Sequence, residues 1–135
     1  MNVVPYFNFN GECREAFEYY HRVFGGELAA MITLADMGVP DPGDGSSNLI
    51  MHARLDFEGQ TIMASDVTDS LNNAPAPVQV SIHPDTVEDA ERIYAALTEG
   101  GEIVMPLEKQ DWAERFAFFK DRFGIPWIIN VEPSN

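Results

Sequence analysis

The residues best suited to proton transfer are a histidine and an aspartate on one predicted hairpin. In residues 49–57 apolar side chains alternate with polar ones, which predicts a strand whose polar side carries His52. Asp66 ends the following run, residues 60–66. If both side chains face one pocket, the imidazole can act as a general base and the carboxylate can orient it. We therefore take His52 and Asp66 as the candidate catalytic pair.

Each member of this pair has a structural alternative. The polar side of the first strand faces either solvent or a concave cavity, and a hydrogen-bonded structural histidine is the competing interpretation. The residues on that side are His52, Ile50, Arg54 and Asp56. Asp66 could instead begin a polar loop, because aspartate favours turns.

The elements that position these residues follow from apolar periodicity and from glycine and proline placement. The predicted order is a strand over 3–9, a helix over 12–24, a strand over 27–34, a loop over 35–47, and the hairpin of 49–57 and 60–66. The loop holds three glycines, two prolines and three aspartates, so it cannot be regular structure, and it could close over a ligand as a lid.

The second half repeats this order after a linker-like stretch, 67–77. We predict a strand over 78–83, a helix that ends at Glu99 before the glycine pair, a short strand over 103–105, a loop over 108–112, and a hairpin of 115–120 and 125–131. Asp85 with Glu88, or Thr86 with Asp89, supplies the helix cap. His83 is interpreted as a loop residue at a strand end. The glycine pairs Gly25-Gly26 and Gly100-Gly101 end the two helices 75 residues apart, which indicates an internal duplication.

Composition excludes several partners. The 135 residues include 22 acidic and 8 basic ones, and a formal charge of −14 repels phosphate backbones, so we expect no nucleic-acid partner. No apolar run approaches the roughly 18 residues of a membrane span, and no leader-like segment is visible, so we expect a cytoplasmic protein without a membrane partner. The single cysteine, Cys13, cannot form an internal disulfide and is expected to be buried and inert.

Several short segments in combination resemble the PhnB-like family. They are Pro5 to Gly11, Ala16 to Tyr20, Met51 to Ala53, Ala64 to Asp66, and Asp121 to Trp127. This family belongs to the glyoxalase, bleomycin-resistance and extradiol-dioxygenase (vicinal oxygen chelate) superfamily, and the resemblance covers essentially the whole chain. It implies an α+β fold: one domain over 1–135 made of two βαβββ modules, about 1–68 and 76–132. Their sheets would form a half-barrel around a cavity, completed in a homodimer.

The resemblance also implies where a divalent metal would bind, through His or Glu ligands on four strands. The corresponding positions here are Pro5, Asp66 or its neighbour Ala64, residues 78–80, and Ile128. They supply one carboxylate and one amide, that of Gln79, whereas a transition metal needs about three or four protein ligands. We therefore predict no metal and no other cofactor.

The strands that would line the half-barrel are rich in aromatic residues. The candidate substrate-binding residues are Tyr6, Gln79, Trp112, Phe119 and Trp127. The aromatic residues could equally belong to the core. Trp112 differs from the others because it is predicted in a loop, where an aromatic ring can close over a small molecule.

Three functions remain open. The first is a protein, catalytic or not, that holds a small, partly apolar molecule in a metal-free cavity. The second is a non-catalytic sequestering module, like the drug-binding resistance proteins of this fold. The third is a metal-dependent lyase, isomerase or dioxygenase with ligands in another register. The methyltransferase label often given to PhnB-like proteins is not expected to apply, because Gly25-Gly26 follows a helix instead of joining a strand to a helix.

Overall fold

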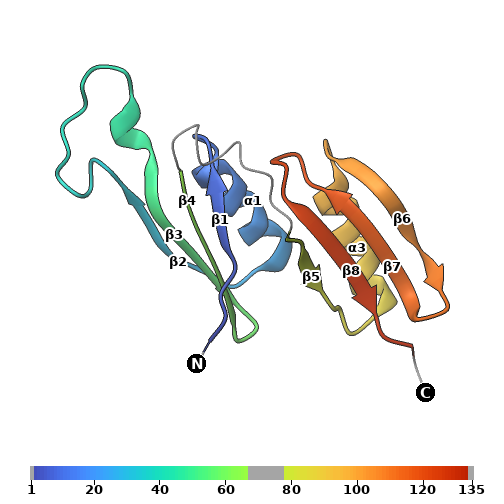
Figure 1. Cartoon of the computed structure of the whole chain (residues 1–135). Helices are drawn as coiled ribbons and strands as arrows, with labels where there is room; N and C mark the ends of the chain where they lie inside the picture. The colour runs from blue at the N-terminus through green and yellow to red at the C-terminus, as the bar shows by residue number, and fades with distance from the viewer. Residues whose placement is uncertain (1, 67–77, 134–135) are drawn as a thin grey trace. The chain divides into compact units, whose positions relative to one another are not determined.

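The computed structural model describes residues 2–66 and 78–133 (Figure 1). The chain divides into two compact units, residues 1–75 and 76–135. Each unit has one four-stranded sheet with an α-helix packed on it, which confirms the predicted α+β class. The predicted linker, 67–77, lies outside the described residues.

The first unit is a βαβββ module with a short 3₁₀ helix before its third strand. Its elements are β1 (Tyr6–Phe9), α1 (Cys13–Phe24), β2 (Glu27–Thr33), η1 (Ser46–Asn48), β3 (Ile50–Phe57) and β4 (Gln60–Asp66). The strand order is β1-β4-β3-β2; β1 runs parallel to β4, and the other neighbours are antiparallel. The two-residue turn between β3 and β4 is the predicted one, Glu58-Gly59, and both residues have positive φ.

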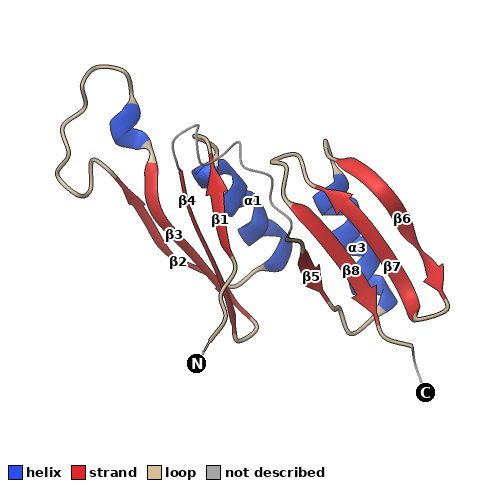
Figure 2. Ribbon diagram, in the orientation of Figure 1, coloured by secondary structure: helices blue, strands red, loops and turns tan. Residues whose placement is uncertain are grey.

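The second unit repeats this topology (Figure 2). Its elements are β5 (Val80–Ile82), α3 (Val87–Thr98), β6 (Glu102–Gln110), β7 (Ala113–Lys120) and β8 (Pro126–Val131), with the strand order β5-β8-β7-β6. Of the two predicted caps for this helix, Thr86 is the one used, since its hydroxyl accepts the backbone N–H of Asp89 at 3.1 Å.

The repeated glycine pairs have a physical reason. The first glycine of each pair has a φ near +75°, a conformation that an L side chain rarely adopts. The second is in close contact with a strand: a Cβ on Gly26 would collide with the backbone oxygen of Asp56, and one on Gly101 with that of Lys120. Each helix therefore turns directly onto its own sheet.

The cores lie between each helix and its sheet. In the first unit four rings pack edge to face, and they come from β1 and α1: Phe7, Phe9, Phe17 and Tyr20. Cys13 is fully buried at the start of α1, as predicted. Within the described ranges, no helix combines the length and apolar character needed to cross a bilayer.

Strand β6 corrects one prediction. The sequence predicts a strand over 103–105 and a loop over 108–112, whereas β6 continues to Gln110. Its pairing with β7 contains three register irregularities, and most of its side chains are exposed. Backbone pairing at the sheet edge therefore forms this strand without the apolar alternation that would reveal it in the sequence.

Candidate functional site

The candidate site is the face of the first sheet opposite α1. On the helix side of β3, Ala53 and Leu55 are fully buried. Side chains alternate along a strand and paired residues share a face, so the strand register identifies the open side. It carries Tyr6, Ile32, His52, Arg54, Asp56 and Thr61. Ile50, which the sequence pattern groups with His52, is instead buried next to a register irregularity in the β2–β3 pairing.

Two predicted site residues meet on this face. The rings of Tyr6 and His52 are stacked, with centroids 6.5 Å apart and an angle of 26° between their planes. They belong to β1 and β3, which flank β4, so both rings reach over the strand between them. Tyr6 is 48% exposed, which leaves much of its side chain open to contact with another molecule.

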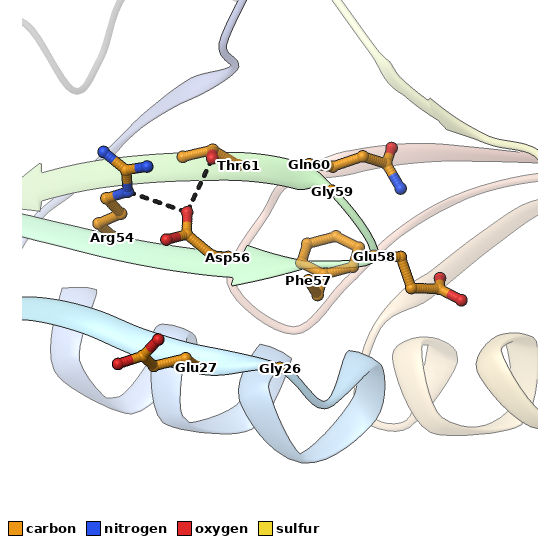
Figure 3. A pocket seen from close by; sticks show the side chains of 9 residues that line it. All are labelled: Gly26, Glu27, Arg54, Asp56, Phe57, Glu58, Gly59, Gln60 and Thr61. Carbon is orange, nitrogen blue, oxygen red and sulfur yellow. Dashed lines mark hydrogen bonds and ion pairs between the residues drawn. The ribbon is translucent and has the colours of Figure 1, made fainter.

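Beside this pair lies an arginine held by two neighbours. Arg54 Nε donates to Asp56 Oδ1 at 2.9 Å, and the Thr61 hydroxyl donates to the same oxygen at 2.7 Å (Figure 3). These two hydrogen bonds, with the Thr61 bond contributing most, hold the pKa of Asp56 below its usual value. The aspartate is therefore an anion at neutral pH, and it fixes the guanidinium on the open face.

The arginine also borders an open hollow of about 430 Å³ at the hairpin end of the sheet. Its walls come from the ends of three strands, and Figure 3 shows Arg54 and Asp56 pointing to one side of β3, toward Thr61. Sequence reasoning placed Arg54 and Asp56 beside His52 but assigned them no role. The two-residue turn at Glu58-Gly59 could have indicated the Asp56–Thr61 contact in the sequence, because a turn of that length pairs these two residues across the hairpin.

Asp66 lies elsewhere and has a structural role. Its Oδ1 accepts the backbone N–H groups of Gly11 at 2.9 Å and Cys13 at 3.0 Å, and its Oδ2 accepts that of Ile50 at 2.8 Å. The buried carboxylate thus caps α1 from β4, because α1 has no cap from its own preceding residue. The predicted pair, with His52 as the base and Asp66 as the carboxylate that orients it, is therefore not formed.

Two predicted binding residues are core residues. Trp127 is 1% exposed, and its indole N–H donates to Asp121 Oδ2 at 2.8 Å. Phe119 is fully buried and packs edge to face on Tyr94 of α3. Their side chains point toward the helix side of the second sheet, so they cannot touch a molecule on its open face. The alternative core interpretation is the correct one for both.

The remaining two candidates are exposed in the second unit. Gln79 precedes β5, and Trp112 occupies the turn between β6 and β7. Trp112 is 54% exposed, and its ring meets Phe116 edge to face at 5.4 Å. Both remain available for contact with a ligand.

The metal positions implied by the sequence resemblance do not fit a divalent ion. Pro5 has no donor side chain and Ile128 is aliphatic, while both oxygens of Asp66 are engaged by backbone N–H groups. Within residues 2–66 and 78–133, no three His, Cys, Asp or Glu side chains lie together as a metal site would require.

Known proteins resemble this chain over nearly all of its length. A family model described as 3-demethylubiquinone-9 3-methyltransferase matches residues 1–130. Protein YjdN of Escherichia coli K12 is 31% identical over 140 residues, covering 97% of this chain and 95% of that protein. The crystal structure of protein PA1353 from Pseudomonas aeruginosa is 41% identical, covers 99% of both chains and superposes with a TM-score of 0.89. A PhnB protein from Bacillus cereus is 21% identical, covers 97% and 99% of the two chains, and has a TM-score of 0.81.

More distant structures share the fold alone. The fosfomycin resistance protein FosX from Listeria monocytogenes is 14% identical with a TM-score of 0.63, over 98% of this chain and 93% of that one. A glyoxalase-related enzyme from Fulvimarina pelagi is 14% identical with a TM-score of 0.59, over 98% and 90%. The glyoxalase-like fold predicted from the sequence is therefore confirmed.

Proposed function

The chain belongs to the 3-demethylubiquinone-9 3-methyltransferase (PhnB-like) family, and we propose that it binds a small aromatic anion on the open face of its first sheet, without a divalent metal. The observation that carries the proposal is the stacked Tyr6–His52 pair next to the anchored Arg54. This face includes the polar side of β3, for which the sequence leaves two interpretations open, solvent or a concave cavity.

The ring spacing supports a flat ligand. A planar ring inserted between two others needs about 3.5 Å on each side, roughly 7 Å in total. The centroids of Tyr6 and His52 are 6.5 Å apart, near the upper limit for two rings in direct contact, so these partly exposed side chains would have to move apart to admit a third ring. Stacking contacts of this kind contribute about 0.5–1.5 kcal/mol beyond their buried area.

The arginine supports an anionic group at one end of that ligand. Tyr6 and Arg54 are both aligned with Met63, one on each side of β4, so their backbones lie two strand spacings apart, roughly 10 Å. A fused two-ring carboxylate is about that long. Asp56 engages Arg54 through Nε, which leaves the two terminal nitrogens of the guanidinium to donate to a carboxylate.

Binding without turnover is the version of this function that the geometry favours. The imidazole of His52 is paired with an aromatic ring, and Asp66 is fully engaged by backbone groups, so the predicted base and carboxylate are not assembled. On this face of the first sheet, the arrangement supports sequestering of a ligand over catalysis. The β1–α1 connection does not resemble a methyl-donor site, because it contains one glycine, Gly11, whose N–H donates to Asp66.

The test is titration of the purified protein with 2-naphthoate by isothermal calorimetry. Tyr6→Ala should weaken binding about 2- to 12-fold, the equivalent of one lost stacking contact, while Tyr6→Phe should not. Arg54→Gln should weaken 2-naphthoate about tenfold and leave the neutral 2-naphthamide unaffected. Arg14→Gln, on the exposed side of α1, is the matched control. Equal affinity in wild type, Tyr6→Ala and Arg54→Gln would overturn the proposal.

The metal-free part of the proposal has its own measurement. Mass spectrometric metal analysis of the purified protein should find no stoichiometric ion, and nickel, zinc, manganese or iron(II) should not raise the melting temperature. A stoichiometric metal would restore the lyase, isomerase or dioxygenase interpretation and show that the ligand register is wrong.

The proposal also includes a homodimer. Strand β6 lies at a sheet edge and exposes Ile103 and Val104, an arrangement through which a second copy can pair. Size-exclusion chromatography with light scattering should give twice the 15.1 kDa of one chain. A monomer mass at micromolar protein concentration would contradict the homodimer.

A further inference from the structure

On the open face of the second sheet, a serine, a histidine and a glutamate lie in a row, with the histidine between the other two. Ser81 Oγ lies 2.9 Å from His83 Nε2, and His83 Nδ1 lies 3.7 Å from Glu132 Oε1. Ser81 belongs to β5, while His83 and Glu132 follow the ends of the parallel strands β5 and β8. Trp127 and Ile129 are buried beneath α3, so alternation places these polar residues on the other side of the sheet.

We propose that Ser81, His83 and Glu132 form an acyl-transfer site for small esters, with Ser81 as the nucleophile. The 2.9 Å contact lets His83 Nε2 accept the hydroxyl proton, and the carboxylate near Nδ1 favours the tautomer that leaves Nε2 free to do so. Glu132 orients the ring and offsets the positive charge that develops on it. At 3.7 Å that contact is electrostatic, and rotation of the exposed Glu132 side chain can shorten it.

The reaction balances without a co-reactant other than water. Ser81 Oγ forms a bond to the acyl carbon as its proton passes to His83 Nε2, and the ester C–O bond breaks as that proton passes to the leaving oxygen. Water then bonds to the acyl carbon and gives a proton to Nε2. The bond between the acyl carbon and Oγ breaks, which releases the acid, and the proton on Nε2 returns to Oγ. The products are one carboxylic acid and one alcohol.

Neighbouring groups narrow the class of ester. Asn130 follows Ile129, which pairs with Ile82, so continued register places Asn130 beside His83 on the open face. Its Oδ1 is buried and accepts no hydrogen bond from the described residues. A buried acceptor without a donor favours a ligand that supplies one. The site therefore fits esters whose acyl part carries an N–H or O–H group.

Access to the nucleophile is open. Ser81 is exposed, and the side chains of His83 and Glu132 are 50% and 73% exposed. Substitution of these surface side chains should therefore leave the fold intact. The proposal is independent of the aromatic-anion site, because all its residues belong to the second unit.

The test is labelling of the full chain with a fluorophosphonate, read by intact mass and by peptide mapping. We expect one phosphonyl group per chain, on Ser81, and none in Ser81→Ala. His83→Asn should slow labelling at least 100-fold, the contribution of a general base, and Glu132→Gln should slow it less. Ser46→Ala is the matched serine control and should label like wild type.

Turnover provides a second readout that does not depend on the label. The p-nitrophenyl ester of N-acetylglycine should release p-nitrophenolate faster than p-nitrophenyl acetate does, and Asn130→Leu should remove that preference. Circular dichroism and the melting temperature should be measured for each variant to check that it is folded. No label on folded wild type, label on another residue, or equal rates in wild type and His83→Asn would each overturn the proposal.

Discussion

Replacing Asp66 tests whether this buried carboxylate holds the first unit together or acts on a ligand. Its two oxygens accept three backbone N–H groups, from the β1–α1 turn, the start of α1 and the start of β3. An alanine at this position leaves those donors without a partner inside the protein. We therefore expect Asp66→Ala to be strongly destabilising.

The magnitude follows from the burial of each bond. The bonds from Cys13 and Ile50 are buried, and an unsatisfied buried donor costs about 1–3 kcal/mol, so the two together cost about 2–6 kcal/mol. The bond from Gly11 is partly buried, and water can replace it. Asp66→Asn keeps one acceptor oxygen and should cost about half as much. Domains of this size have a free energy of unfolding of about 5–15 kcal/mol, so either loss is measurable.

The assay is urea unfolding followed by circular dichroism and tryptophan fluorescence, at neutral pH and equal protein concentration. The matched control is Asp44→Asn, an exposed aspartate that accepts the N–H of Ser46, and it should unfold at the wild-type midpoint. The reasoning is refuted if Asp66→Ala and Asp66→Asn unfold like wild type while 2-naphthoate binding is lost. That result would give Asp66 a role in the site instead, such as the carboxylate that orients His52, which is the role predicted from the sequence.

Three further predictions concern the cores and turns. Burial and the nearby Asp66 raise the pKa of the Cys13 thiol from 9.0 to about 12, so the native protein should resist iodoacetamide at pH 8.5 and react once unfolded. As pH rises, the unfolded chain loses this proton before the folded one does, so the thiol's contribution to stability should decline between pH 9.0 and about 12. In Cys13→Ala the free energy of unfolding should therefore depend less steeply on pH over that window. Gly101→Ala should lower the free energy of unfolding by about 1–3 kcal/mol through collision with the Lys120 backbone, and an unchanged urea midpoint would show that the approach is not close. Glu58→Asn should raise it by about 0.5–1 kcal/mol, since Glu58 has a φ of 49° in a turn that favours Asn-Gly; a lower melting temperature would contradict this.

Much of the fold could be predicted because it rests on local patterns. Both helices show apolar residues at three- and four-residue steps, and the 75-residue offset between the glycine pairs revealed the duplication. The glycines carry this signal because each pair joins a left-handed turn to a close helix–strand approach, which no other residue permits. The edge strand β6 was predicted too short, because its pairing irregularities interrupt the alternation of apolar and polar side chains along the strand.

The site was only partly predictable because alternation identifies two faces without saying which one a helix covers. In β8 the two faces are Trp127 with Ile129 and Ile128 with Asn130, and both contain an apolar residue. Only the packing of α3 shows that Trp127 is buried, with its indole N–H on Asp121. An aromatic residue on a strand therefore could not be assigned to the core or to a ligand from the sequence.

The sequence by itself determined the local elements, their repetition, and the polar side of β3 that carries His52 and Arg54. Tertiary structure decided what each polar group does, because its partners come from distant parts of the chain. Asp66 caps a helix that begins 53 residues before it, and Tyr6 meets a histidine two strands away in the sheet. Local periodicity records which side of an element is apolar, but hydrogen bonds and ring contacts depend on which elements the fold brings together.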